Sequence, residues 1–265
     1  MSSLLLNGFG GGSALLDISP DQLLPFEPEQ KLVVIVPTYN EAENLPRLLK
    51  ALFGLQIENL HVLIVDDNSP DKTGEMAAQL ALDDYPGRLE VLHRPGKFGL
   101  GTAYIMGFNH ALRQGATHLV EMDADFSHDP NVIQKFWQII QHNDVTVGSR
   151  YVPGGSIDES WSRLRRIISK GGSIYARAVL GLKVQDTTAG FKMFRAEALR
   201  KLPLERVRSN GYAFQVEMAY LCQKNGLQVE EVPIHFTDRK LGVSKMSAKI
   251  ALEAAWRVWQ IKFRY

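Results

Sequence analysis

The stretch KLVVIVPTYNEAENLPRLLKALF, residues 31–53, decides the fold of this chain. It opens with LVVIVP, residues 32–37, an unbroken apolar run rich in β-branched side chains, which is typical of a strand buried on both faces of a parallel sheet. The following segment predicts a helix with one apolar face, formed by Leu45, Leu48, Leu49 and Leu52. A buried strand followed directly by such a helix is the repeating unit of a parallel α/β sheet.

The same strand–helix unit recurs as far as residue 150. Further buried strands are predicted at HVLIVDD, LEVLH, THLVEMD and DVTVGSR, residues 61–67, 89–93, 117–123 and 144–150. The alternation then becomes irregular, with strands expected at residues 188–195 and 227–236 and helices at 163–182, 212–226 and 247–265. We therefore expect an α/β protein with an open, doubly wound sheet, which the second half of the chain extends without forming a separate domain.

Three segments are predicted along the chain. Residues 1–30 contain a glycine run without regular periodicity and are expected to form a flexible N-terminal tail. Residues 31–245 are expected to form the α/β domain, and residues 246–265 an amphipathic C-terminal helix.

The composition limits the class of protein. The 265 residues carry 30 Lys and Arg against 29 Asp and Glu, so there is no general basic field and nucleic acid is not expected as a partner. The single cysteine, Cys222, excludes an intrachain disulfide, suits a reducing compartment and is expected to be a small core residue. No run approaches the ~18–20 apolar residues of a membrane-spanning helix, and the first residues lack the basic start of a signal peptide. We expect a cytoplasmic protein.

The predicted strands end in unusually polar sequences, PTYNE, DDNSPD, DADFSHD and GSR. Because ligands of open α/β sheets bind at the carboxyl ends of the strands, we expect a ligand site there. A nicotinamide dinucleotide site is disfavoured, since the near-match GLGTAY carries Tyr104 where the third glycine of the fingerprint belongs and does not follow the first strand. The Walker pattern is absent as well. The GLG segment is better explained as a close backbone turn leading into a helix N-terminus.

Two acids, Asp123 and Asp125, end one of these strands with Ala124 between them. Repulsion between the carboxylates favours a bound cation, and a few oxygen ligands suit Mg²⁺ or Mn²⁺ completed by waters and substrate phosphates. Seven scattered histidines and one cysteine offer no zinc set. A third acid, Asp129, precedes Pro130 and is expected to cap the following helix rather than bind the metal.

Nine motifs follow one another in the chain: VPTYNEAENLP, IVDDNSPDKT, GLGTAYIMGF, MDADFSHDP, GSRY, RRIISKGG, DTTAGFKMFR, GYAFQVEM and EVPIHFTDRKLGVSKM. Together they resemble dolichyl-phosphate (polyprenyl-phosphate) mannosyltransferases, which are inverting family 2 glycosyltransferases with a GT-A (Rossmann-like) fold. The resemblance covers residues 31–250 and is to the short form, which lacks transmembrane helices. It implies transfer of mannose from a GDP-mannose donor to a polyprenyl (dolichyl-type) phosphate acceptor with inversion.

The resemblance also implies which residues bind the donor. Those that would line the nucleotide pocket are Pro37, Tyr39, Glu41, Val65 and Asp67. Tyr39 would lie near the guanine, and Asp67 would accept hydrogen bonds from the base or the ribose.

The metal and the phosphates have their own implied residues. Those that would hold the metal and the donor diphosphate are Asp123, Ala124 and Asp125, with both acids as metal ligands. The cations implied for the phosphates are Arg150, Arg239 and Lys245. Two further residues on matching motifs are Asp186 and Gln215, the latter at the substrate. The expected catalytic residues are Asp125, Arg150 and Asp186.

An acceptor that is already a phosphate anion needs cations to place it rather than a general base. Such cations gather in the second half of the chain, at Arg150, Arg163, Arg165, Arg166, Lys170, Arg239 and Lys245. Segments 163–182 and 247–265 mix cations with apolar residues, which indicates either helices at a membrane interface or ordinary core packing. A lipid acceptor favours peripheral contact with the cytoplasmic face of a membrane, direct or through a small membrane-anchoring subunit.

Two other functions stay open on these residues. One is a polyprenyl-phosphate glucosyltransferase that uses UDP-glucose, because no residue in the motifs excludes glucose. The other is a non-catalytic subunit that binds a nucleotide sugar. The intact set of acids and cations argues against the second.

Overall fold

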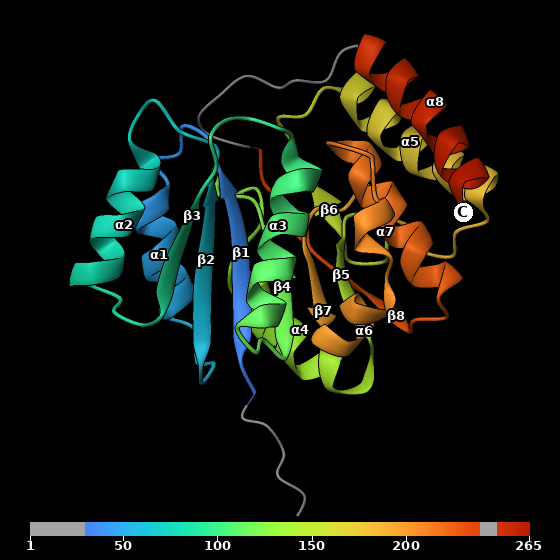
Figure 1. Ribbon diagram of the computed structural model, residues 1–265. Coiled ribbons are helices and arrows are strands. Elements are labelled where there is room, and N and C mark those ends of the chain that lie inside the picture. The colour runs from blue at the N-terminus through green and yellow to red at the C-terminus, as the bar shows by residue number, and fades with distance from the viewer. Residues whose placement is uncertain (1–29, 239–247) are drawn as a thin grey trace, which may run out of the picture.

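The computed structural model describes residues 30–238 and 248–265. Its centre is a seven-stranded sheet in the order β3-β2-β1-β4-β7-β5-β8, with helices on both faces (Figure 1). The strands of this sheet are β1 (Leu32–Thr38), β2 (Leu60–Asp66), β3 (Leu89–His93), β4 (His118–Glu121), β5 (Val145–Ser149), β7 (Lys192–Arg195) and β8 (Val229–Pro233). A second, two-stranded sheet pairs β6 (Ser156–Ile157) with β9 (His235–Phe236).

The helices follow the strands as the apolar periodicity predicts, except for the short α6, which was not predicted. They are α1 (Leu45–Phe53), α2 (Thr73–Asp83), α3 (Leu100–Arg113), α4 (Val132–Ile139), α5 (Arg163–Leu180), α6 (Ala196–Lys201), α7 (Tyr212–Lys224) and α8 (Ala248–Arg264). Short 3₁₀ turns lie at η2 (Ile140–His142) and η3 (Leu204–Arg206). None of the helices in the described part of the chain is long and apolar enough to cross a bilayer.

The apolar run of β1 supplies both halves of the core, because successive side chains of a strand point to opposite faces. Val33 and Ile35 pack with residues of α3, α6 and α7 on one face of the sheet. Leu32, Val34 and Val36 pack with residues of α1, α2 and α4 on the other. The expected doubly wound α/β sheet, buried on both faces, is therefore confirmed.

The order of the strands fixes where a ligand can bind. From β1 the chain moves outward through β2 to β3, then returns to place β4 on the other side of β1. This reversal between β1 and β4 leaves a crevice at their carboxyl ends. The acids that follow β4 lie in this crevice.

The second half of the chain extends the same sheet, as expected, but with one reversed strand. β7 lies between β4 and β5 and is antiparallel to both, whereas the other paired strands of the large sheet are parallel. Cys222 of α7 is buried in the core, and burial raises the pKa of its thiol to about 12, so it is a packing residue as predicted.

The C-terminal helix α8 packs against α5 and α7 rather than standing apart from the domain (Figure 1). Val258 and Ile261 of α8 are buried against Ala176 and Leu180 of α5. The Tyr175 hydroxyl donates a hydrogen bond to the carbonyl of residue 255 at 3.2 Å. The predicted N-terminal tail lies, apart from its last residue, outside the described residues.

The GLG segment forms the predicted close turn into a helix. Gly99 precedes α3 with a φ of +100°, a region that side chains other than glycine rarely occupy. A Cβ on Gly101 would lie 2.6 Å from the carbonyl oxygen of Ser209, so glycine is required for α3 to approach the start of α7.

Candidate active site

A cavity of about 390 Å³ lies at the carboxyl ends of β1, β2, β4 and β5, where the strand order reverses. Most of the residues that the resemblance implied for the donor and the metal meet there. Those that line the cavity are Pro37, Tyr39, Glu41, Asp67, Asp123, Ala124, Asp125, Arg150 and Gln215. They come from five separate regions of the sequence, so the fold itself assembles this set.

The two acids after β4 are held by hydrogen bonds from their own surroundings. Asp123 Oδ1 accepts one from the hydroxyl of Tyr104, at 3.2 Å. Asp125 Oδ1 accepts from the backbone N–H of Ser127, at 3.0 Å, and from the Ser127 hydroxyl. Between Asp125 and Ser127 the chain turns sharply at Phe126, whose φ of +59° is strained for a bulky residue and is typical of a functional loop.

Two cations that the sequence did not single out, Arg94 and Lys97, lie beside Asp67 and Tyr39. Asp67 forms an ion pair of 2.8 Å with Arg94, which follows β3. Burial raises the pKa of Asp67, and the positive charge of Arg94 opposes that rise. Lys97 Nζ lies 3.8 Å from the centre of the Tyr39 ring. Tyr39 is 39% exposed, so part of its aromatic side chain is open to solvent.

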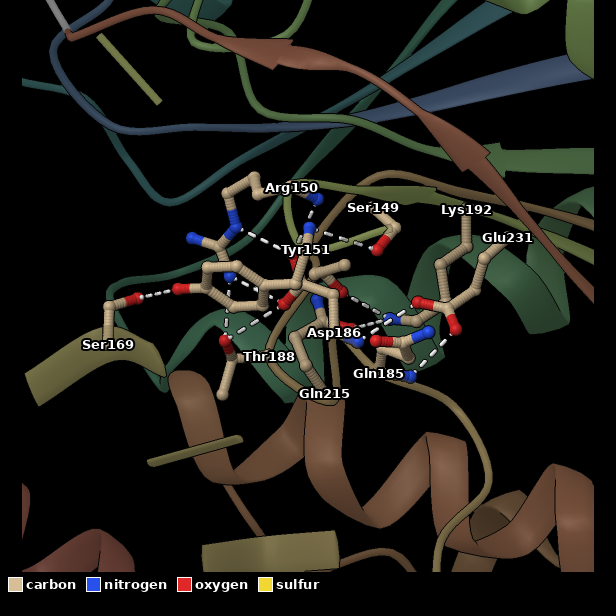
Figure 2. A network of polar contacts seen from close by, with 11 residues as sticks. Ser149, Arg150, Tyr151, Ser169, Gln185, Asp186, Thr188, Lys192, Gln215 and Glu231 are labelled. Atoms are coloured by element: carbon tan, nitrogen blue, oxygen red, sulfur yellow. Dashed lines mark hydrogen bonds and ion pairs between the residues drawn. The ribbon is translucent and has the colours of Figure 1, made fainter. Parts of the chain in front are cut away.

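Arg150 is held rigidly by Asp186 (Figure 2). Its Nε and Nη2 donate to the two carboxylate oxygens at 2.7 and 2.6 Å, and its backbone N–H donates to one of them at 3.0 Å. Burial alone would raise the pKa of Asp186, but the charge and the hydrogen bonds of Arg150 outweigh the effect of burial, so the pKa of Asp186 is lowered. Arg150 lines the cavity and Asp186 does not.

A second buried ion pair lies under the cavity, between Lys192 and Glu121. The two residues face each other across β4 and β7, and Lys192 Nζ donates to Glu121 Oε1 at 2.7 Å. Burial raises the pKa of Glu121, and Lys192 opposes that rise. Lys192 also donates to the side-chain oxygen of Gln215 (Figure 2). An ammonium group can only donate, so the amide nitrogen of Gln215 must point elsewhere, toward Gly190 at the cavity wall.

The sequence that forms this site matches a known family. The model of glycosyl transferase family 2 matches residues 33–203, which include both acids, Arg150 and Lys192. The chain belongs to glycosyl transferase family 2. It is therefore a glycosyltransferase, and the resemblance found in the nine motifs is confirmed at the level of the family.

Two curated relatives of this glycosyltransferase are similar over most of their length. One is the polyprenol monophosphomannose synthase of Mycolicibacterium smegmatis, 45% identical over 89% of this chain and 89% of the relative. The other is the undecaprenyl-phosphate mannosyltransferase of Micrococcus luteus, 44% identical over 89% of this chain and 96% of the relative.

Solved structures share the fold at lower identity. Glucosyl-3-phosphoglycerate synthase from Mycobacterium tuberculosis, in complex with Mn²⁺, UDP and glucosyl-3-phosphoglycerate, superposes with a TM-score of 0.63 at 14% identity. The match covers 89% of this chain and 79% of that one. This likeness confirms the GT-A fold of the family 2 glycosyltransferase.

The basic residues of α5 have different environments in this glycosyltransferase. Arg165 lines the cavity, with its guanidinium 3.6 Å from the Trp161 ring centre and 3.0 Å from Asp238. Arg166 donates hydrogen bonds to backbone carbonyls of the preceding loop and so stabilises that loop. Two others of the predicted group, Arg163 and Lys170, are exposed and do not line the cavity. Two more, Arg239 and Lys245, lie outside the described residues.

Two of the residues predicted for the site, Val65 and Asp186, do not line the cavity. Val65 is fully buried in the core on the α3 side of the sheet and does not line the cavity. Its position in the interior of β2 points its side chain at the helix layer, whereas Asp67 lies past the strand end. Asp186 was expected to be catalytic, but both its oxygens face Arg150 and its exposed fraction is 0%.

Asp129 was expected to cap the next helix, but α4 begins at Val132 and its N-cap residue is Asn131, without a side-chain cap hydrogen bond. Asp129 is exposed, lies outside the cavity lining, and its Oδ1 accepts from the Asn131 backbone N–H at 2.9 Å. Its own carbonyl accepts from the N–H of Val132, the first residue of α4. These contacts show that Asp129 stabilises the turn that leads into α4 and does not cap the helix itself.

Proposed function

We propose that this glycosyltransferase transfers mannose from GDP-mannose to a polyprenyl (dolichyl-type) phosphate with inversion, giving polyprenyl β-mannosyl phosphate and GDP. The observation that carries the proposal is the joint lining of one cavity by two acids and two held cations, Asp123 and Asp125 with Arg150 and Arg165. The names of both curated relatives, which specify mannose and polyprenyl phosphates, support the same substrates.

Asp123 and Asp125 are the residues that would hold Mg²⁺ or Mn²⁺. Carboxylate oxygens suit either ion, and both acids are already oriented by hydrogen bonds. Among residues 30–238 and 248–265, no group of three His, Cys, Asp or Glu side chains could hold an ion without other ligands. This fits an ion that also binds waters and substrate phosphates. When bound, the metal supplies positive charge to the diphosphate leaving group.

The nucleoside would be held by Tyr39 and Asp67. Tyr39 offers an aromatic surface for the guanine, and Asp67 offers carboxylate oxygens to N–H or hydroxyl donors of the base or ribose. Arg94 fixes the Asp67 carboxylate through the 2.8 Å ion pair. Lys97, beside Tyr39, adds a positive charge where the donor enters.

Arg150 and Arg165 would place the acceptor phosphate. Each guanidinium is anchored, by Asp186 and by Asp238, so little side-chain freedom is lost when a phosphate binds. An oxygen of the acceptor phosphate then forms a bond to the anomeric carbon as the bond to the GDP oxygen breaks on the opposite face, which inverts the configuration. The acceptor phosphate is already an anion, so no general base has to remove a proton from it. His128 also lines the cavity, but burial lowers its pKa to about 4, which makes it a weak base.

The experiment that tests the proposal offers labelled GDP-mannose and UDP-glucose in parallel, with a polyprenyl phosphate and either Mg²⁺ or Mn²⁺. We expect a mannosyl lipid from GDP-mannose only. A glucosyl lipid from UDP-glucose would establish the other donor, and binding of both donors without any product would establish a non-catalytic subunit. Arg165→Ala should raise the KM for the lipid phosphate, whereas the exposed Lys170→Ala on the same helix should not.

We also propose that α5 and α8 lie against the cytoplasmic face of a membrane. α5 exposes Leu164, Ile167 and Ile174, spaced along one stripe of the helix, at 67%, 68% and 55%. On the neighbouring α8, Trp256 and Phe263 are 64% and 80% exposed. Large apolar side chains flanked by cations are typical of helices that bind anionic lipid surfaces.

This membrane contact supports the acceptor proposal, because α5 carries Arg165 on its cavity side and Ile167 on its exposed side. Flotation with vesicles containing anionic lipid tests it. The triple variant Ile167→Ser, Trp256→Ser, Phe263→Ser should stay unbound, and Leu82→Ser, an equally exposed apolar residue on α2, should float like the unaltered protein. If the unaltered protein itself does not float, a small membrane-anchoring subunit would take the place of direct contact.

A further inference from the structure

Tyr104 is a buried side chain of α3 whose hydroxyl reaches the acidic side of the cavity. Its exposed fraction is 0%, and its hydroxyl donates to Asp123 Oδ1 at 3.2 Å. In the sequence it stands out only as a mismatch to a dinucleotide fingerprint. In the fold its hydroxyl donates a hydrogen bond to the first of the two acids.

Close packing of α3 carries Tyr104 to this position. A Cβ on Gly101 would lie 2.6 Å from the Ser209 carbonyl oxygen, and a Cβ on Gly107 would lie 2.5 Å from Ile35 Cγ2. Glycine at both positions therefore lets α3 approach α7 and β1 more closely than an ordinary helix could. The hydroxyl of Tyr104, between these glycines in the sequence, thereby comes within reach of the end of β4.

The ring of Tyr104 has little freedom to move. It stacks on Phe214 of α7 with centroids 5.9 Å apart and an interplanar angle of 7°. It also stacks on Phe108 of α3, at 6.1 Å and 23°. The hydroxyl is therefore held in place by aromatic packing on two helices, and its hydrogen bond to Asp123 is set by the core of the protein rather than by a mobile loop.

We propose that Tyr104 is a positioning residue for the metal–nucleotide site: its hydroxyl orients the Asp123 carboxylate so that Asp123 and Asp125 can bind one divalent cation together with a nucleoside diphosphate. The inference rests on the proposed role of both acids as metal ligands. A carboxylate held in one orientation before binding loses less side-chain freedom on binding a cation. Ser127 does the same for Asp125 through its N–H and hydroxyl, so each acid has its own orienting partner.

The test removes one oxygen atom. In Tyr104→Phe the ring can stay between Phe108 and Phe214, and only the hydrogen bond to Asp123 is lost. Mn²⁺ affinity is measured by electron paramagnetic resonance, in the presence of GDP and, separately, of UDP. Because outer-shell hydrogen bonds typically contribute 10–100-fold to metal affinity, we expect Tyr104→Phe to weaken Mn²⁺ binding by about tenfold or more.

Two controls separate positioning from general damage. Tyr85→Phe removes a hydroxyl from a ring that stacks on Phe53 at 4.2 Å, on the opposite face of the sheet, and should bind Mn²⁺ like the unaltered protein. Asp123→Asn should lose most Mn²⁺ binding. Thermal melting of Tyr104→Phe should give nearly the Tm of Tyr85→Phe, which shows that the packing of the ring is kept.

The proposal is overturned if Tyr104→Phe binds Mn²⁺ as tightly as the unaltered protein. It is also overturned if the loss of binding is matched by a large fall in Tm, since Tyr104 would then act through the core as a whole. The readout needs no turnover. A failure of GDP-mannose as donor would thus refute the proposed function and leave this measurement standing.

Discussion

Replacement of Lys192 by methionine should expose how strongly the fold depends on the ion pair under the cavity. Lys192 and Glu121 are 2% and 0% exposed in their side chains, and the ammonium also donates to the Ala189 carbonyl and to Gln215. Removal of one partner of such a pair leaves a buried charge uncompensated and costs about 3–5 kcal/mol. For a domain of this size, each kcal/mol lowers Tm by roughly 2–4 °C, so a fall of roughly 6–20 °C is expected.

The loss of stability in Lys192→Met should be larger at high pH than at low pH. Burial already raises the pKa of Glu121 and Lys192 opposes that rise, so the methionine variant should have a still higher folded-state pKa. An acid whose pKa is higher in the folded than in the unfolded state destabilises the fold as pH rises through that value. The free energy of unfolding lost in Lys192→Met should therefore be larger at about pH 8 than at about pH 5, measured by urea denaturation.

A double variant distinguishes the charge from the packing. Glu121→Leu with Lys192→Met replaces the pair by apolar side chains, which often restores stability. Gln215 still lacks the hydrogen bond that Lys192 donates to its side-chain oxygen. Stability should recover and transfer activity should stay low. The exposed Lys170→Met serves as the matched control. A loss below about 1 kcal/mol in Lys192→Met, as for a surface pair, would refute the reasoning, and so would an equal loss at both pH values.

Three other results are expected. Asp125→Ala should abolish transfer and weaken metal-dependent donor binding in a titration, and near-normal turnover of this variant in chelator would contradict the metal site. Asp129→Asn should keep its activity in the same assay because asparagine also accepts the Asn131 N–H, and a loss as large as that of Asp125→Ala would make Asp129 a ligand. Burial lowers the pKa of His118 to about 4, so the unfolded chain binds the proton more readily and stability should rise between about pH 4 and pH 6.5. His118→Gln should flatten that rise in urea denaturation, and an unchanged slope would exclude His118 as its source.

The sequence was sufficient to predict the parallel half of the sheet. The runs that became β1 and β2 are almost wholly apolar, and in a chain of alternating strands and helices such short apolar runs indicate strands buried on both faces. The reversed direction of β7 was not predictable, because a strand carries no mark of its direction and only tertiary packing sets it. The two-residue strands β6 and β9 are too short to give any periodicity.

The candidate site was predictable where its residues follow strand ends. Asp123, Asp125 and Arg150 follow buried strands, where polar residues gather at one edge of the sheet, whereas Asp67 was assigned through the family resemblance. Tyr104, Arg94 and Lys192 gave no such signal. Lysine in the segment KMFR is indistinguishable from a surface residue until its neighbour across the sheet, Glu121, is known.

The reversed strand β7 also sets the order in which the site can be completed as the chain is made. β4 can pair with β1 once residue 121 has left the ribosome, whereas β5 pairs only with β7 and β8, so it must wait for residues 192–195. The acidic side of the cavity therefore forms early, and Arg150, together with its anchor Asp186, is added late. A nascent chain has an open edge along β4 in the interval, which is when it is most exposed to mispairing.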